Sequence, residues 1–143
     1  MPLLIAEPPA VYRQNPPAVV DAGILAAFIF LEPEATETEA RISRYTLFAP
    51  NILPLEIANV AMNKLRRGIA DAHELGERLS AFNFNCLQLR ETPPDGVFAL
   101  AADYRLSAYD AACLWLAGDL RAPLLTYDVR LAEAARDFLA RLR

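Results

Sequence analysis

The chain has 143 residues, of which 55% are hydrophobic, and a formal net charge of -4 at pH 7. This length suits one domain with a substantial core, and the negative charge excludes a general attraction to nucleic acid, so such contact needs a local basic patch or bound metal ions. No apolar run reaches the roughly 18 residues of a membrane span, and the N-terminus lacks the basic flank and apolar stretch of a signal peptide, so we expect a cytoplasmic protein.

Five of the eleven prolines fall within the first 17 residues. Proline disfavours helix, so we predict an extended, proline-rich N-terminal arm over residues 1–17. The sequence leaves open whether the arm is a disordered leader or contacts a partner. Residues 18–143 show no internal repeat or boundary and are predicted to form a single domain.

The cysteines and the single histidine are not placed as catalytic groups. Cys86 and Cys113 lie in apolar stretches without Cys-x-x-Cys spacing, which predicts buried free thiols rather than a disulfide or a zinc site. His73 lies on a charged helix that begins with Asp71 and Glu74 at capping spacing. We expect it on the surface and not as a general base.

Hydrophobic periodicity and capping residues predict strands that alternate with helices, singly or in pairs. The expected strands are residues 19–20, 45–49, 86–90 and 122–126. The expected helices are residues 23–31, 36–45, 52–67, 71–84, 96–104, 107–120 and 128–143. Thr36 with Glu39 and Asp95 are two further predicted helix starts. The alternation favours an α/β layered domain with a mostly parallel sheet.

Asp21 is the one charged side chain in the stretch 18–31, whose other residues are apolar or glycine. It lies where the first predicted strand ends and a helix begins, and ligands of open α/β sheets bind at this edge. A buried, unpaired carboxylate is costly, so Asp21 needs hydrogen bonds, a cation or a metal. The alternative interpretation is a simple N-cap of the following helix.

Three other acids, Glu56, Asp110 and Asp128, also lie at element ends. Ser107 and Asp110 have capping-box spacing, and Asp128 suits an N-cap, so Asp110 and Asp128 each have a purely structural explanation. Capping does not explain why Asp21 and Asp128 both follow strands. If those strands are neighbours, the two acids converge, and Asp110 at an adjacent helix start can join them.

The predicted helix 52–67 has one apolar face and one polar face. The apolar face, predicted to be the core stripe, holds Leu55, Ala58, Met62 and Leu65. The polar face holds Glu56, Asn59, Asn63 and Arg67. This polar face is either ordinary solvated surface or one wall of a groove.

A cluster of carboxylates raises the pKa of its members unless a cation neutralises them. Oxygen ligands of this kind suit Mg²⁺ or Mn²⁺, which bind through one or two carboxylates and keep several waters. Such ions activate a water and stabilise charge on a phosphate. An acidic pocket can in this way accept a polyanion.

Four blocks of the sequence, in order, resemble PIN-domain proteins and specifically the VapC-type ribonuclease toxins of type II toxin–antitoxin pairs. The blocks are Val19-Val-Asp21-Ala, Leu55-Glu56-Ile-Ala-Asn59, Tyr109-Asp110-Ala-Ala and Leu125-Thr126-Tyr-Asp128-Val-Arg-Leu131. The resemblance implies a three-layer α/β/α sandwich whose parallel sheet carries an acidic, Mg²⁺- or Mn²⁺-dependent ribonuclease site. It also implies an RNA substrate, a cognate antitoxin and a homodimer.

The same resemblance implies roles for single residues. Asp21, Glu56 and Asp110 correspond to the acids that hold the metal, and Asp128 to a fourth acid that completes the catalytic pocket. Thr126 corresponds to a hydroxyl that supports Asp128 or the metal shell. A further correspondence is Asn59, a polar position on the helix of Glu56.

The sequence departs from the family pattern at two places. The proline-rich leader before Asp21 is longer than usual, and Gly23 stands near a position that is commonly a small hydroxyl residue. The second departure removes one hydrogen bond expected around the metal. Basic residues that can meet RNA phosphates, or else form a solvated face, are Arg13, Lys64, Arg66 and Arg67.

Two alternative functions remain at this point. The first is a non-catalytic PIN-like binding module, whose acids are helix caps and whose apolar helices serve a partner. The second is a receiver-like phosphoacceptor domain, which also gathers acids at strand ends. That class needs a lysine after a late strand, and no lysine occurs between Thr126 and Arg143, so we rank it below the other two.

Overall fold

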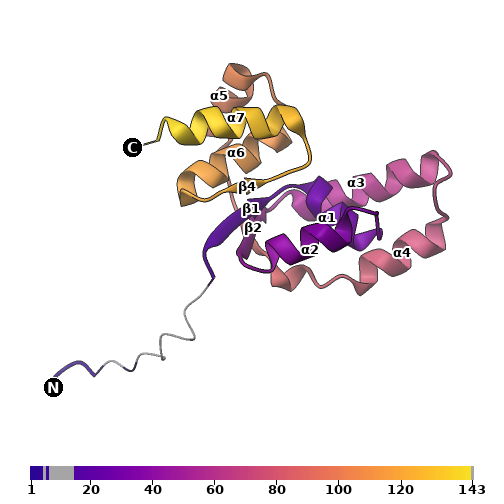
Figure 1. Ribbon diagram of the computed structural model, residues 1–143, viewed down its shortest axis with the longest axis horizontal. Coiled ribbons are helices and arrows are strands. Elements are labelled where there is room, and N and C mark those ends of the chain that lie inside the picture. The colour runs from indigo at the N-terminus through magenta and orange to yellow at the C-terminus, as the bar shows by residue number, and fades with distance from the viewer. Residues whose placement is uncertain (5, 7–14, 143) are drawn as a thin grey trace.

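Figure 1 shows a computed structural model of the chain, which describes residues 1–4, 6 and 15–142. In this described part, parallel strands form one sheet with a helical layer on each side. Helices α5, α6 and α7 lie together on one side of the sheet, and α1 to α4 lie on the other. The elements in chain order are β1 (Pro17–Val20), α1 (Ala22–Ile29), α2 (Ala35–Ile42), β2 (Thr46–Pro50), α3 (Leu53–Arg66), α4 (Ala72–Ala81), the short 3₁₀ helix η2 (Phe84–Cys86), β3 (Gln88–Arg90), α5 (Pro94–Tyr104), α6 (Ala108–Leu120), β4 (Leu124–Leu125) and α7 (Val129–Ala140). The predicted α/β/α sandwich is confirmed.

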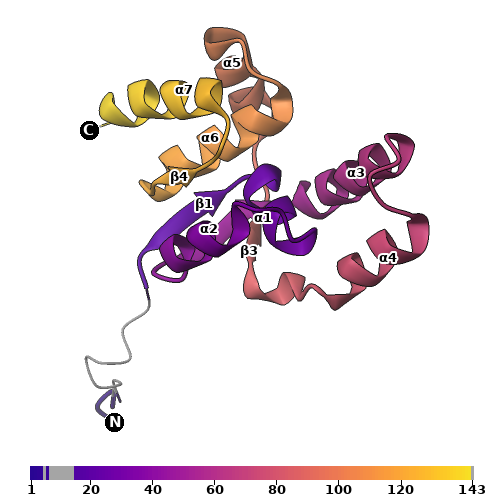
Figure 2. The same cartoon turned by 45° about the vertical axis from the view of Figure 1, so that its right-hand side comes forward.

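The strand order is β3-β2-β1-β4, and every pairing is parallel. The chain runs outward from β1 through β2 to β3, then returns by α5 and α6 to place β4 on the free side of β1 (Figure 2). The direction of winding therefore reverses between β1 and β4. In open α/β sheets, the carboxyl ends of strands at such a reversal form the ligand-binding crevice.

Side-chain alternation along β1 explains the two layers. Val19 packs against Cys113 and Leu116 of α6. Val20 points to the other face and packs with the core formed by α1 and α3. Consecutive residues of a strand face opposite sides, so two adjacent, fully buried valines anchor both helical layers.

Helix α3 buries a different face from the predicted one. Its buried side chains are Leu53, Ile57 and Ala61, and the predicted core stripe is exposed instead: Leu55, Ala58, Met62 and Leu65. Both sets have helical spacing, and the short connection from β2 turns the first set toward the sheet. As a consequence Glu56, next to Ile57, lies at the border of the buried face and is half-buried rather than solvated.

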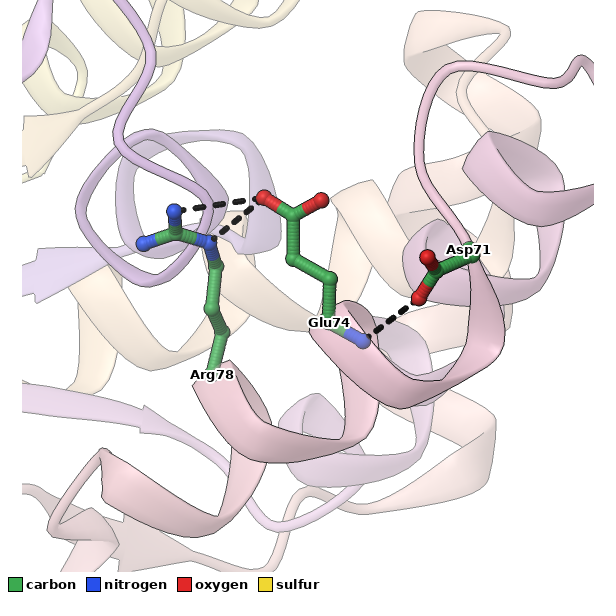
Figure 3. A network of polar contacts seen from close by, with 3 residues as sticks. All are labelled: Asp71, Glu74 and Arg78. Carbon is green, nitrogen blue, oxygen red and sulfur yellow. Dashed lines mark hydrogen bonds and ion pairs between the residues drawn. The ribbon is translucent and has the colours of Figure 1, made fainter.

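Capping explains where several helices begin. Asp71 Oδ1 accepts a hydrogen bond from the Glu74 N–H at 2.8 Å at the start of α4, and Arg78 pairs with Glu74 one turn later (Figure 3). The predicted start at Thr36 is wrong, because α2 begins at Ala35 and has no side-chain cap.

The predicted cap at Asp95 is also wrong. Pro94 takes the first position of α5, where its missing N–H has no cost, and Asp95 lies in the first turn. There its charge still complements the positive end of the helix dipole.

The two thiols are free, but only Cys113 is buried, so the prediction that Cys86 is buried is wrong. Cys86 ends η2, so the third strand begins at Gln88, two residues later than predicted. His73 is exposed, as predicted. No helix among the described residues has the length and apolarity needed to cross a membrane. The division into an arm and a domain stays a prediction.

Candidate active site

The acids at the reversal point of the sheet lie at the carboxyl ends of the central strand β1 and of its neighbour β4, which is an edge strand. Asp21 directly follows β1, and Thr126 directly follows β4. Because Val20 pairs with Leu125, the next residues of the two strands are also side by side. The topology therefore brings together two segments that are 105 positions apart in the sequence.

Asp21 is a helix cap and a buried carboxylate at the same time. Its Oδ1 accepts a hydrogen bond from the Ile24 N–H at 3.0 Å, which caps α1. Its Oδ2 accepts a short hydrogen bond from the Thr126 hydroxyl. The residue is only 8% exposed. Both interpretations of Asp21 are thus compatible, because the cap uses one oxygen and the cluster uses the other.

Thr126 links Asp21 to Asp128. The Thr126 Oγ1 that donates to Asp21 also accepts a hydrogen bond from the Asp128 N–H at 3.0 Å. Asp128 in turn caps α7, its Oδ1 accepting from the Leu131 N–H at 3.1 Å. One hydroxyl therefore holds the two acids that follow β1 and β4 in a fixed relation.

Glu56 and Asp110 reach the same place from α3 and α6. Ser107 Oγ accepts a hydrogen bond from the Asp110 N–H at 3.1 Å, so the predicted cap at the start of α6 is confirmed. Glu56 comes from the first turn of α3, at the border of its buried face. Its Oε1 is buried and has no hydrogen-bond partner among the described residues.

Electrostatic coupling shows that the carboxylates share one site. Burial, with Asp110 and Asp21, raises the pKa of Glu56 to about 7. Burial, with Asp128, raises the pKa of Asp110, although Ser107 and Arg130 oppose the shift.

Asp21 is subject to the same forces. Burial, with the nearby Asp110 and Asp128, raises its pKa, and its hydrogen bonds from Thr126 and Ile24 oppose that shift. Asp21, Glu56 and Asp110 therefore form the mutually coupled set, with Asp128 beside two of them.

The donor set fits a divalent cation. It consists of carboxylate oxygens, which Mg²⁺ and Mn²⁺ prefer, and a buried oxygen without a partner needs either a proton or a cation. In the described residues no three acid, histidine or cysteine side chains close around a single point. Mutual repulsion keeps carboxylates apart without a cation, and Mg²⁺ needs only one or two protein ligands because it keeps its waters.

The surroundings of the acids include residues that the sequence analysis did not select. Arg130 is the cation near Asp110, and its guanidinium donates to the Arg105 carbonyl at 2.9 Å. Burial and the nearby carboxylates of Asp21, Glu56 and Asp110 raise the pKa of the Cys113 thiol, which lies beneath them. The position of Arg130, two residues after Asp128, could have indicated from the sequence that it lies near the acids. No feature of the sequence indicates that Cys113 lies beneath them.

A cavity of about 460 Å³ opens beside Glu56 and is lined in part by Asn59, Leu55 and Tyr109. Asn59 is exposed, on the same side of α3 as this opening. A Cβ built at Gly23 would meet Asp21 Oδ1 at 3.5 Å, an ordinary contact distance, so this position borders the acid cluster.

The basic residues predicted to meet RNA phosphates differ in their surroundings. Lys64 is paired with Glu32 at 2.8 Å and lies over the ring of Phe30. Arg66 and Arg67 are exposed at the end of α3, and Arg13 lies outside the described residues.

Comparison with known proteins places the chain among similar sequences and folds. The PIN domain profile matches residues 18–137. Ribonuclease VapC3 of Pyrobaculum aerophilum is 34% identical over 122 residues, which span 80% of this chain and 92% of that protein. The crystal structure of PAE2754 from Pyrobaculum aerophilum superposes with a TM-score of 0.58 at 23% identity, covering 87% of this chain and 95% of that one. At this identity the structural likeness concerns the fold.

Proposed function

The chain belongs to the PIN-domain family, and from that premise we propose that it is a ribonuclease that depends on Mg²⁺ or Mn²⁺. In this proposal it hydrolyses RNA phosphodiester bonds as the toxin of a toxin–antitoxin pair, as the name of its relative VapC3 suggests. The proposed location of this activity is the cytoplasm. Asp21, Glu56, Asp110 and Asp128 are the proposed catalytic and metal-binding residues.

The observation that carries this proposal is the partnerless Oε1 of Glu56 in a cluster of carboxylates at the reversal point of the sheet. Acids that only capped helices or faced solvent would not need to share a site. A bound divalent ion would neutralise the cluster, supply an activated water and stabilise the charge that develops on a phosphate. It would also explain how an acidic site in a chain of net charge -4 accepts RNA.

The residues of the site have separate roles in the proposed reaction. Glu56, Asp21 and Asp110 would hold the ion, since the charges of Asp110 and Asp21 act on Glu56 and the charge of Asp110 acts on Asp21. Thr126 orients Asp21 and, through the Asp128 N–H, the last acid. Arg130 supplies positive charge beside Asp110. No side chain in the described site is arranged as a nucleophile, so the attacking group in this proposal is water.

The exposed stripe on α3 supports a protein partner. Leu55 is 68% exposed, Met62 and Leu65 continue the stripe, and Ile69, just beyond the end of α3, is 60% exposed. An apolar stripe of this kind on a helix is typical of an interaction surface. We propose that it contributes to a homodimer or to the contact with an antitoxin.

The proposed activity is tested with the purified chain and a fluorescently labelled single-stranded RNA. Cleavage is expected with Mg²⁺ or Mn²⁺, should stop with a chelator and should return when the metal is restored. Asp71→Asn is the matched control, because it changes a capping aspartate that lies away from the acid cluster. Cleavage that persists in chelator would contradict the proposal, and no cleavage of any RNA would favour the non-catalytic binding module.

A further inference from the structure

The outer edge of β4 borders a cavity that the proposed ribonuclease function does not use. This cavity of about 460 Å³ has residues 123–127 along one side, and α2 and α7 provide its walls. Because α2 belongs to one helical layer and α7 to the other, the two layers extend past the last strand of the sheet. We call this space the β4 slot.

The backbone of β4 faces the slot with unused hydrogen-bonding groups. The Val19 N–H donates to the Pro123 carbonyl at 2.9 Å, and Val19 is in register with Leu124. In a parallel pairing of this register, the N–H and C=O of Leu124 point away from β1. Strand β4 has no second neighbour in the sheet of described residues (Figure 2), so these two groups are available to another strand.

Two arginines line the slot from opposite walls. Arg41 comes from α2 and Arg136 from α7, and both are exposed. Within the described ranges neither makes an ion pair or a hydrogen bond. The remaining wall is mainly apolar, with Ile42 and Leu139 on the two sides. The slot therefore combines an open strand edge, apolar walls and two free positive charges.

We propose that the β4 slot binds an extended peptide segment that adds a strand beside β4 and places acidic side chains against Arg41 and Arg136. An added strand would run about 4.8 Å from β4, between the two helical layers. Its main chain would pair with Leu124, and its apolar side chains would pack on the walls. Arginine pairs well with carboxylate through its planar fork of donors. An RNA strand lacks the main-chain groups that would pair with a strand edge.

The placement of the two arginines on opposite walls determines how the acidic residues of the peptide are spaced. Successive side chains of a strand point to opposite faces, and Arg41 and Arg136 approach from opposite faces. The two acidic residues must therefore be an odd number of positions apart, for example adjacent. Thr126 lines the slot and also holds Asp21, so the occupant would lie directly beside the acid cluster.

The test uses the full chain in chelator, with peptides as the main probes and a single-stranded DNA oligonucleotide as a separate probe, so its outcome does not depend on the proposed nuclease activity. The probe is a fluorescein-labelled, capped octapeptide of valine and threonine with two adjacent glutamates. Control peptides carry the glutamates two positions apart, replace them with lysines, or are N-methylated at alternate amides. Affinity is measured by anisotropy, and the binding face by NMR shifts of the Leu124 and Leu125 amides.

We expect the adjacent-glutamate peptide to bind at least tenfold more tightly than every control peptide, with shifts at Leu124 and Leu125. The double variant Arg41→Gln, Arg136→Gln should weaken binding at least tenfold. The matched variant Arg66→Gln, Arg67→Gln removes the same charge from α3 and should leave binding unchanged. Equal affinity for the lysine or N-methylated peptides, or an effect of the α3 variant as large as that of the slot variant, would overturn the proposal. Shifts of the β4 amides with a single-stranded oligonucleotide but not with the peptide would also overturn it.

Discussion

The starts of α1 and α4 use the same capping device in two different settings. Asp21 and Asp71 both have an extended backbone, and each accepts a hydrogen bond from the N–H three residues later, at 3.0 Å and 2.8 Å. Asp71 is exposed at the surface, next to the Glu74–Arg78 pair (Figure 3). Asp21 is buried, and its second oxygen faces Thr126 beside other acids.

The difference between these two caps shows what local sequence can and cannot reveal. Both follow the same rule for helix starts, so neither cap by itself indicates a function. Topology makes the difference, because the reversal between β1 and β4 brings Asp110 and Asp128 to Asp21. The following predictions test whether the neighbouring acids, and not the cap, give Asp21 its role.

The largest expected effect is on catalysis. Asp21→Asn keeps an oxygen for the cap but removes a charge from the proposed metal site, and we expect RNA cleavage to fall by about 1,000-fold. Asp71→Asn makes the same chemical change in the other cap and should leave cleavage within about twofold of the wild type. Steady-state cleavage rates of the two variants show whether Asp21 has a role in catalysis beyond capping. Similar activity of both would mean that Asp21 is only a cap.

The second prediction concerns stability without metal, where the pKa of Glu56 is raised to about 7 from its ordinary 4.5. The folded protein holds this proton more tightly than the unfolded chain, so the contribution of Glu56 to stability decreases as pH rises from about 5 to about 7. After allowance for its partial exposure the loss is about 2 kcal/mol. Above that range the contribution changes no further.

The variant Glu56→Gln does not titrate, so its free energy of unfolding in chelator should exceed that of the wild type by a margin that grows across this pH range. Urea unfolding at pH 5.5 and pH 8 measures the margin, and saturating Mg²⁺ should reduce it at pH 8. A margin that is the same at both pH values would contradict the raised pKa.

A smaller effect is expected at Thr126. Replacing it with valine removes the hydroxyl that donates to Asp21 and accepts from the Asp128 N–H. That hydrogen bond lowers the pKa of Asp21, so Thr126→Val should move the rising limb of the pH–rate profile to higher pH. We also expect about tenfold slower cleavage, which corresponds to one lost charge-assisted hydrogen bond. Thr126→Ser keeps the hydroxyl and should keep the wild-type profile; the same loss in both variants would exclude this role.

The smallest expected change in activity comes from removing the control cap altogether. Asp71→Ala should cost about 1 kcal/mol of stability, as loss of an N-cap does elsewhere, with no change in RNA cleavage. Thermal unfolding and the cleavage assay measure both. A large loss of activity would show that α4 supports the site in a way that the buried contacts do not indicate.

Much of the fold could be predicted, because strand and helix patterns alternate clearly and because three acids and a serine cap helices locally. The face of α3 could not, since two apolar stripes with helical spacing compete and only packing on the sheet decides between Leu53 with Ile57 and Leu55 with Met62. For the same reason the partial burial of Glu56 was not foreseen.

The candidate site, like the fold, could be predicted only in part. Asp21, Glu56, Asp110 and Asp128 were selected in advance because each lies at the end of an element, and the fold brings them together. The contribution of Arg130 and the position of Cys113 beneath the acids depend on the packing of α6 and α7. The β4 slot depends on strand order, which the sequence patterns did not specify.

The most direct test of the central claim is Mn²⁺ binding by the wild-type chain and by Asp21→Asn, Glu56→Gln and Asp71→Asn, followed by electron paramagnetic resonance without RNA. We predict saturable binding to the wild type and to Asp71→Asn. Binding to Asp21→Asn and to Glu56→Gln should be at least tenfold weaker. Equal Mn²⁺ binding by all four proteins, or none by the wild type at millimolar Mn²⁺, would contradict the assignment of these acids to a metal site.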